Sequence, residues 1–137
     1  MTVELIKISK GKIIKNKKGN IIKFIDKNNA LFKKFGEIYF SEIKLGQTKG
    51  WNYHKRNTCL LMVTSGKVKF SIYNEAADKI QNVILSEKNN TILQIPPNFW
   101  FSFKSFYKKS KIVNIVDNVH SANESIKSPI IRGIKIK

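Results

Sequence analysis

The sequence predicts one all-β domain, a sandwich or barrel built from short strands. Helical periodicity is nearly absent from the chain. Short runs of β-forming residues separated by turn signals dominate instead, a pattern typical of all-β sandwiches and barrels. The run Lys67–Tyr73 shows the alternation of a half-buried strand most clearly, because Val68, Phe70 and Ile72 share one face and polar side chains share the other.

The expected strands follow one another along the chain. Near the N-terminus, two apolar runs at 13–14 and 21–25 flank Lys17-Lys18-Gly19-Asn20, which predicts a hairpin turn. Glu37–Ile43 alternates and ends at Leu45-Gly46. Further strands are expected at Leu60–Val63, Val83–Leu85, Thr91–Ile95, Phe99–Phe103 and Lys111–Val116.

Turn residues and polar segments complete this layout. Asn89-Asn90 and Pro96-Pro97-Asn98 supply turns, and Asn28–Lys34 is long enough for one helical turn. Beyond about Ser121 the chain is a polar tail that we expect to pack across the barrel or against a partner. The whole chain, residues 1–137, is expected to be a single domain with its core at about 18–124.

Composition places the chain among globular proteins. No apolar run approaches the length of a membrane span, and the N-terminus has no apolar region followed by a small-residue cleavage site. Cys59 is the single cysteine, so no internal disulfide can form. We therefore expect a cytoplasmic protein without membrane contact.

The net charge of +17 raises the question of a polyanionic partner. All basic residues except Arg56 and Arg132 are lysines, and Asn and Ile are abundant, which is the profile of an AT-rich genome. The lysines are spread along the whole chain, and no nucleic-acid-binding motif is present. We expect no specific nucleic-acid partner.

The segment from Gly46 to Gly66 has the spacing of a cupin metal motif. In that pattern a Gly is followed six residues later by His, then by His two further on, an acid or Gln about five later, and a Gly that turns the hairpin. These positions here are Gly46, Asn52, His54, Cys59 and Gly66. The spacing predicts a cupin-type jelly-roll β-sandwich or barrel with a pocket.

The side chains in this frame do not fit the usual metal chemistry. The second cupin segment normally supplies another His, and the corresponding residue here is Phe101. One His, one Asn, one Cys and one Phe cannot build a three- or four-ligand Fe, Mn or Zn site. We therefore predict no metal and no other cofactor, and we exclude a metal-dependent dioxygenase.

His54 is the candidate catalytic residue. Strand alternation places Asn52 and His54 on one face, and Trp51, Tyr53 and Lys55 on the other. Imidazole titrates near neutral pH, so a single His can remove a proton beside a ketone without a metal. The alternative is a hydrogen-bonded structural His.

The other candidates each have a structural alternative. Lys49, Lys55 and Arg56 flank His54 and form either a solvated strand edge or a diphosphate clamp, in which the fork of Arg56 would pair two phosphate oxygens. His120 is expected to be a surface residue. Cys59 occupies an inward position and is expected to be a small buried core residue.

Five segments follow one another in a characteristic order: Gly36–Ser41, Lys49–Thr58, Gly66–Phe70, Ile95–Trp100 and Asp117–Glu124. Together they resemble the deoxysugar-nucleotide 3,5-epimerase superfamily and, more closely, its short cupins, described as dTDP-4-dehydrorhamnose 3,5-epimerase-like. The resemblance covers roughly Lys18 to Glu124. It implies a cytoplasmic jelly-roll homodimer that acts on nucleoside-diphosphate 4-keto-6-deoxy sugars for polysaccharide or glycan assembly.

The departures from this family concern its acid and base. True 3,5-epimerases read Arg-Gly-x-His, where the His is the base, and this chain has Asn52 in that position. The Tyr that reprotonates from the other face falls near Val113. Related 3,4-ketoisomerases carry His-x-His-Lys, of which His54-Lys55 keeps the second half, while their Trp-His pair appears here as Trp100-Phe101.

Two hypotheses from different classes follow. The first is a metal-independent isomerase of the 3,5-epimerase or 3,4-ketoisomerase type, with His54 as general base and a nucleoside-diphosphate 4-keto-6-deoxy sugar as substrate. The second is a non-catalytic cupin that has lost the acid/base pair and binds a sugar nucleotide or a partner protein. A third and weaker hypothesis is a basic protein that binds nucleic acid nonspecifically.

In the enzyme hypothesis, Lys49 and Arg56 bind the diphosphate or stabilise the enolate oxygen. Whichever aromatic side chains face the pocket stack on the base or the sugar. The predicted substrate-binding residues are Lys49, Trp51, Asn52, Tyr53, Arg56 and Trp100. The basic N-terminal part is further expected to add a strand to the partner's sheet in a homodimer.

Overall fold

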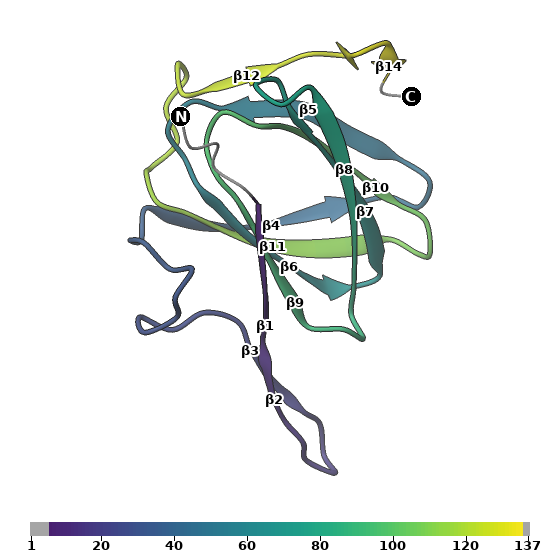
Figure 1. The fold of residues 1–137 in the computed structure, drawn as a ribbon. Helices are drawn as coiled ribbons and strands as arrows, with labels where there is room; N and C mark the ends of the chain where they lie inside the picture. The colour runs from purple at the N-terminus through teal and green to yellow at the C-terminus, as the bar shows by residue number, and fades with distance from the viewer. Residues whose placement is uncertain (1–5, 136–137) are drawn as a thin grey trace.

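The computed structural model describes residues 6–135 and is an antiparallel sandwich of two five-stranded sheets (Figure 1). The first sheet has the order β1 (Lys7–Lys10), β9 (Thr91–Ile95), β6 (Cys59–Ser65), β11 (Ser110–Val116) and β4 (Glu37–Ile43). The second has the order β12 (Ser125–Lys127), β5 (Thr48–His54), β10 (Trp100–Ser105), β7 (Lys67–Asn74) and β8 (Lys79–Ser86). This arrangement confirms the predicted all-β jelly roll.

The main core fills the space between the two sheets. On β7, Val68, Phe70 and Ile72 are buried and Lys69 is exposed, as their alternation predicts. The Phe70 ring packs against Phe103 of β10 with the ring centroids 5.7 Å apart. Phe70 and Phe103 are direct partners within the second sheet, and they form the core together with side chains of the first sheet such as Leu61 and Ile112.

A second apolar cluster covers the outer face of the first sheet. Leu31 packs there with Leu60, Met62, Val113 and other buried side chains. Gln94 of β9 fixes this cover, because its Nε2 donates to the carbonyl oxygen of Leu31 at 2.9 Å. The helical turn expected at 28–34 does not form, because the side-chain oxygens of Asp26 and Asn29 accept from the amides of Asn28 and Leu31 and close separate turns.

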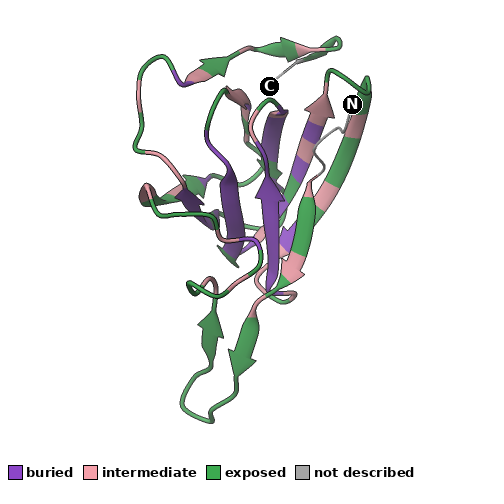
Figure 2. Ribbon diagram, turned by 60° about the vertical axis from the view of Figure 1, so that its left-hand side comes forward, coloured by how far each residue is buried: buried purple, intermediate pink, exposed green. Residues whose placement is uncertain are grey.

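The predicted N-terminal hairpin is present as β2 (Lys12–Ile14) and β3 (Ile21–Lys23). Its turn contains Gly19, whose φ of +137° lies in the region open to glycine and whose N–H donates to the carbonyl oxygen of Asn16. Figure 2 shows the hairpin projecting from the sandwich with both strands exposed.

The polar tail packs against the second sheet, as predicted. β12 pairs with β5, placing Ser125 opposite His54 and Lys127 opposite Asn52. Ser128 and Trp51 then exchange two backbone hydrogen bonds of 2.9 and 3.0 Å. The tail ends in the hairpin of β13 (Ile130–Ile131) and β14 (Ile134–Lys135).

Across residues 6–135 there is no helix of the length and apolar character that crossing a membrane would require.

Candidate active site

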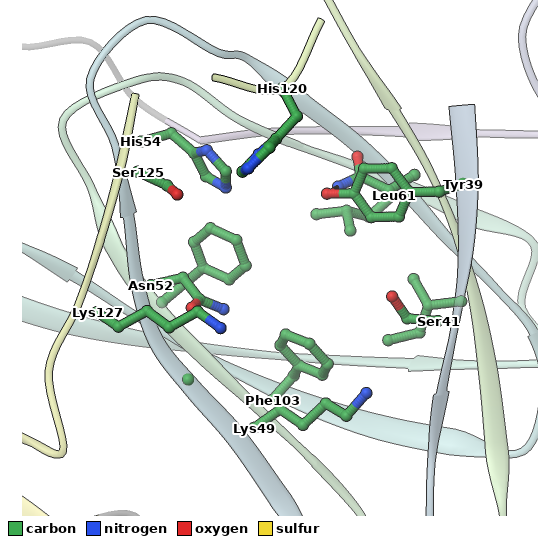
Figure 3. A pocket seen from close by; sticks show the side chains of 14 residues that line it. Tyr39, Ser41, Lys49, Asn52, His54, Leu61, Phe103, His120, Ser125 and Lys127 are labelled. Atoms are coloured by element: carbon green, nitrogen blue, oxygen red, sulfur yellow. Dashed lines mark hydrogen bonds between the residues drawn. The ribbon is translucent and has the colours of Figure 1, made fainter. Parts of the chain in front are cut away.

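A cavity of about 450 Å³ opens between the two sheets (Figure 3). Strands β4, β5, β6, β10 and β11 form its walls, and residues from the segment 120–127 close one side. The volume lies within the usual range of small-molecule sites. Phe101, which replaces the second-segment His, lines it together with Phe103, so part of the wall is apolar.

Strand β5 directs three of the predicted site residues into the cavity. Asn52 and His54 point inward, as their alternation predicts. Lys49 also lines the cavity, although simple alternation would place it on the opposite face from Asn52. The pairing of β5 with β10 shifts register between Phe101 and Phe103, and this bulge turns Lys49 inward.

Gly50 is required at this bulge. Its φ is +120°, and a Cβ atom there would lie 2.8 Å from the carbonyl oxygen of Phe101 and from Cα of Ser102. Any other residue would push β5 away from β10. The Lys-Gly-Trp sequence therefore sets the geometry of the cavity wall as well as contributing a charge to it.

His54 forms a buried pair with Glu124. Its Nδ1 lies 2.8 Å from Oε2 and 3.0 Å from Oε1 of Glu124, whose side chain is fully buried. Since an ionised carboxylate only accepts hydrogen bonds, Nδ1 carries the proton and Nε2 is left as the acceptor. The imidazole also stacks on Phe101 with a centroid distance of 5.9 Å.

Glu124 is held in its ionised form. Burial alone would raise its pKa, but hydrogen bonds from His54 and from the backbone amides of Asn57 and Arg56 outweigh burial and lower the pKa below the usual value. The Asn57 amide donates to Oε1 at 3.0 Å. A buried carboxylate behind an imidazole orients the ring and stabilises its protonated form.

The sequence reading did not assign a role to Glu124. Its segment is polar and lacks strong periodicity, so nothing local marks the side chain as buried. The loop that contains it is fixed at both ends: Asp117 Oδ1 accepts from the Thr58 amide at 2.8 Å, and Glu124 accepts from Asn57. Two acids that accept from consecutive backbone amides pin this loop beside His54.

Tyr39 and Asn114 form a second polar pair in the cavity, on the first sheet. Asn114 Nδ2 donates to the Tyr39 hydroxyl at 2.9 Å, which leaves the phenolic proton free to donate elsewhere. Burial, with a smaller contribution from Cys59, raises the pKa of Tyr39 to about 12. The Oδ1 atom of Asn114 is buried and has no hydrogen-bond partner within the described residues.

Val113, which falls near the position of the family's tyrosine, does not line the cavity, but Tyr39 of β4 does. Val113 faces the other way and packs in the cluster with Leu60 and Met62. Sequence counting could not find Tyr39, because β4 and β11 become neighbours only through sheet pairing.

The remaining predicted contacts lie outside the cavity. None of Trp51, Tyr53 and Trp100 lines it: Trp51 is fully buried, with its Nε1 donating to the Ile134 carbonyl oxygen at 3.1 Å. Tyr53 and Trp100 pack on each other with a centroid distance of 5.1 Å. Arg56 is exposed beyond the end of β5 and does not line the cavity either.

The sequence also predicted the surroundings of Cys59 and His120. Cys59 is buried in the main core, as predicted, and burial raises the pKa of its thiol to about 12. His120 is exposed, as predicted, but it also lines the cavity, which the sequence reading did not anticipate.

The lysines that line the cavity are Lys49 of β5 and Lys127 of β12, and both are exposed to solvent. In residues 6–135, no three His, Cys, Asp or Glu side chains converge as a metal site would need. The cavity thus combines an imidazole–carboxylate pair, a phenol, two ammonium groups and apolar walls. That set suits an anionic ligand with a sugar-sized polar part.

The solved structures most similar to this chain include several sugar-nucleotide enzymes. A dTDP sugar isomerase from Desulfovibrio desulfuricans G20 matches with a TM-score of 0.88 and 28% identity, over 93% of this chain and 85% of that one. The epimerase RmlC from Legionella pneumophila Philadelphia 1, in complex with dTDP-4-keto-L-rhamnose, matches with 0.83 and 17%, over 96% and 78%.

A third similar structure is a mutant of the 3,4-ketoisomerase QdtA from Thermoanaerobacterium thermosaccharolyticum in complex with TDP-4-keto-6-deoxyglucose. It matches with a TM-score of 0.80 and 20% identity, over 93% of this chain and 90% of that one. At their level of identity, RmlC and QdtA support the fold alone. No curated protein matches the sequence.

The fold is that of a cupin similar to these sugar-nucleotide epimerases and isomerases. The model of the WxcM-like, C-terminal family (FdtA) matches residues 1–130. The chain belongs to this family.

Proposed function

We propose that the protein is an isomerase of nucleoside-diphosphate 4-keto-6-deoxy sugars, and that it begins by removing the proton beside the ketone. The observation that supports this proposal is the His54–Glu124 pair within the cavity, with Nδ1 and Oε2 separated by 2.8 Å. The pair leaves Nε2 of a neutral imidazole as a base, and the carboxylate stabilises the imidazolium that forms.

The developing enolate needs hydrogen-bond donors at its oxygen. Tyr39 is suited to this role, because its proton is free while its oxygen accepts from Asn114. A phenol with a pKa of about 12 stays protonated at neutral pH and donates without losing its proton. Asn52 occupies the position of an epimerase base, and as an amide it orients a substrate hydroxyl.

Lys49 and Lys127 are the cations available to the diphosphate. Both line the cavity, whereas Arg56 does not, so we assign the diphosphate contact to the two lysines in place of the predicted Arg56. Phe101 and Phe103 provide the apolar surface against which the sugar lies and limit the access of water to the enolate.

Solvent exchange tests the chemistry. In D₂O the wild-type protein should incorporate deuterium at C3 or C5 of dTDP-4-keto-6-deoxyglucose, and NMR can follow this incorporation. The His54→Ala variant should show no incorporation. Lys55→Ala is the matched control, because its exposed neighbouring side chain is outside the cavity. Binding without exchange on several 4-keto sugar nucleotides would replace the isomerase with the alternative, a cupin that binds sugar nucleotides without turnover.

We further propose that the chain forms a homodimer through its N-terminal hairpin and that it serves cytoplasmic deoxysugar synthesis for polysaccharides. An isolated two-stranded hairpin is barely stable in water. Every residue of β2 and β3 is nevertheless exposed, including the apolar side chains of Ile13, Ile14, Ile21 and Ile22. A second copy would cover these side chains.

The oligomeric state can be tested without removing β1 from its sheet. The double variant Ile13→Lys and Ile22→Lys should elute as a monomer in size-exclusion chromatography with light scattering, while the wild type elutes as a dimer. A wild-type monomer at micromolar concentration would refute the dimer but would leave the proposed chemistry untouched.

A further inference from the structure

Moving a ketone from C4 to C3 of a sugar transfers protons at carbon and at oxygen, and this inference rests on the isomerase function proposed above. His54 is placed to serve as the carbon base. A second protein group that delivers and removes protons at the two oxygens would speed the reaction. Asn52 cannot exchange a proton at neutral pH, and Phe101 offers none, so such a group would come from elsewhere in the cavity.

His120 is the other imidazole at the cavity. It lines the same cavity as His54, and Figure 3 shows both rings directed into it. His54 comes from β5, whereas His120 comes from the loop after β11. Strands β6 to β11 separate the two histidines in the sequence, and the fold brings both to the same cavity.

The loop holds His120 in place even though its side chain is exposed. The His120 amide donates to Oε1 of Glu37 at 3.1 Å. At the start of the loop, Asn118 packs so closely on Gly36 that a Cβ there would lie 2.4 Å from the Asn118 nitrogen. At its end, Glu124 is bound to His54. An anchored backbone on both sides gives the imidazole a defined approach to a ligand.

The other protic groups at the cavity are less suited to carry a proton in both directions. Tyr39, with a pKa of about 12, holds its proton too tightly to release it at neutral pH. Lysine ammonium groups ordinarily titrate above pH 10. Imidazole ordinarily titrates near neutrality, so it can donate and accept within one catalytic cycle.

We propose that His120 is a second catalytic residue, which exchanges protons with the substrate oxygens while His54 exchanges protons with carbon, and that the reaction is a 3,4-ketoisomerisation. His54 Nε2 takes the proton from C3, and the C–H electron pair forms the C3=C4 double bond. The C4 carbonyl π electrons move to O4, which takes a proton from the His120 imidazolium.

The resulting enediol collapses in the opposite sense. His120, now neutral, takes the proton from the C3 hydroxyl, and C4 takes the proton held by His54 as the carbonyl forms at C3. Both imidazoles return to their starting states, and no atoms or electrons are gained or lost. Tyr39 and Asn114 hydrogen-bond the oxygens without changing their own protonation.

The test separates the two proton carriers. dTDP-4-keto-6-deoxyglucose in D₂O is followed by NMR for deuterium at C3 and for conversion to the 3-keto isomer. We expect His120→Ala to slow conversion by about 100-fold or more, the usual contribution of a general acid–base group, and exchange at C3 by less than about 10-fold. Free imidazole should restore part of the conversion. Val119→Ala, on the same loop and exposed, is the control and should match the wild type.

Each other outcome is decisive. Equal conversion by His120→Ala and Val119→Ala would overturn the role of His120, as would an equal loss of exchange and conversion without rescue by imidazole. Exchange by the wild type that yields only a C3 or C5 epimer would overturn the ketoisomerisation. No exchange at all by the wild type would overturn the proposed function itself, and with it this inference.

Discussion

The two faces of strand β5 differ completely in what their side chains do. Lys49, Asn52 and His54 face the cavity, whereas Trp51 is buried on the other face beneath the C-terminal tail. Tyr53, also on that face, packs against Trp100. Aromatic residues adjacent in sequence to the candidate base thus contribute to packing and not to ligand contact.

The packed face nevertheless supports the chemical one. The tail that covers Trp51 continues directly from β12, which places Ser125 and Lys127 at the cavity and follows Glu124. Burial of Trp51 therefore helps to hold the segment that orients His54. We therefore expect substitutions on the cavity face of β5 to reduce catalysis more than stability, and substitutions on its other face to reduce stability more than catalysis.

Loss of the Glu124 charge should have the largest effect. In Glu124→Gln the ring of His54 loses its anionic partner, so the imidazolium formed during proton removal is destabilised. We expect exchange at the sugar carbon to fall by about 100-fold or more. Glu42→Gln, an exposed residue in weak surface ion pairs at 3.9 Å, is the control. Near-normal exchange in Glu124→Gln would remove the dyad from the mechanism.

The same variant should change the pH dependence of stability. Because the folded-state pKa of Glu124 is lowered, its contribution is present above the ordinary carboxyl range and is lost as the pH falls through the folded pKa. Urea unfolding should therefore show wild-type stability decreasing below about pH 4.3, the ordinary glutamate value. Glu124→Gln should show a shallower decrease, and parallel curves would contradict the lowered pKa.

On the outer face, Trp51→Ala should destabilise the fold by about 3–5 kcal/mol, as removal of a large buried aromatic side chain does. It also removes the hydrogen bond to Ile134, so the tail should become more accessible to limited proteolysis. Tyr53→Ala provides the contrast, because Tyr53 is only partly buried. If Trp51→Ala reduced exchange without a loss of stability, the division between the two faces would be wrong.

Local sequence patterns determined the fold and half of the site. The alternation in β7 and the hairpin turn at Gly19 could be predicted because they depend on residues that are neighbours in the sequence. The inward direction of Asn52 and His54 could be predicted for the same reason. Lys49 was predicted as a site residue from its place in the motif, but its inward direction depends on the bulge at Gly50, which interrupts the alternation.

Long-range partners could not be found in this way. Glu124 meets His54, and Tyr39 meets Asn114, only after sheet pairing and loop closure bring the segments together. His120 was read as a surface residue because its segment is polar, and exposure does not exclude a place at a cavity mouth. The sequence therefore identified the candidate base, His54, and the structure identified the groups that surround it.

Removal of the Tyr39 hydroxyl should have an intermediate effect. Tyr39→Phe removes one donor to the enolate oxygen and leaves Asn114 Nδ2 without its acceptor, so we expect exchange to slow by about 10-fold, which corresponds to one hydrogen bond of about 1.4 kcal/mol. Val113→Ala, on the outer face of the same sheet, should lower stability without this kinetic effect. A kinetic effect of Val113→Ala as large as that of Tyr39→Phe would indicate a general loss of order.

The smallest expected effect concerns KM, and it distinguishes Lys49, near the start of β5, from Arg56, beyond its end. Lys49 lines the cavity, and Arg56 does not, so Lys49→Gln should raise KM for the sugar nucleotide by about 3–5-fold, as expected for a solvent-accessible ion pair, and leave kcat almost unchanged. The increase should shrink at high salt, because screening weakens an accessible contact in the wild type as well. Arg56→Gln should leave KM near the wild-type value. If Arg56→Gln raised KM and Lys49→Gln did not, the diphosphate would bind at the exposed end of the strand, outside the cavity. Arg56 would then make the diphosphate contact that the sequence predicted for its forked guanidinium.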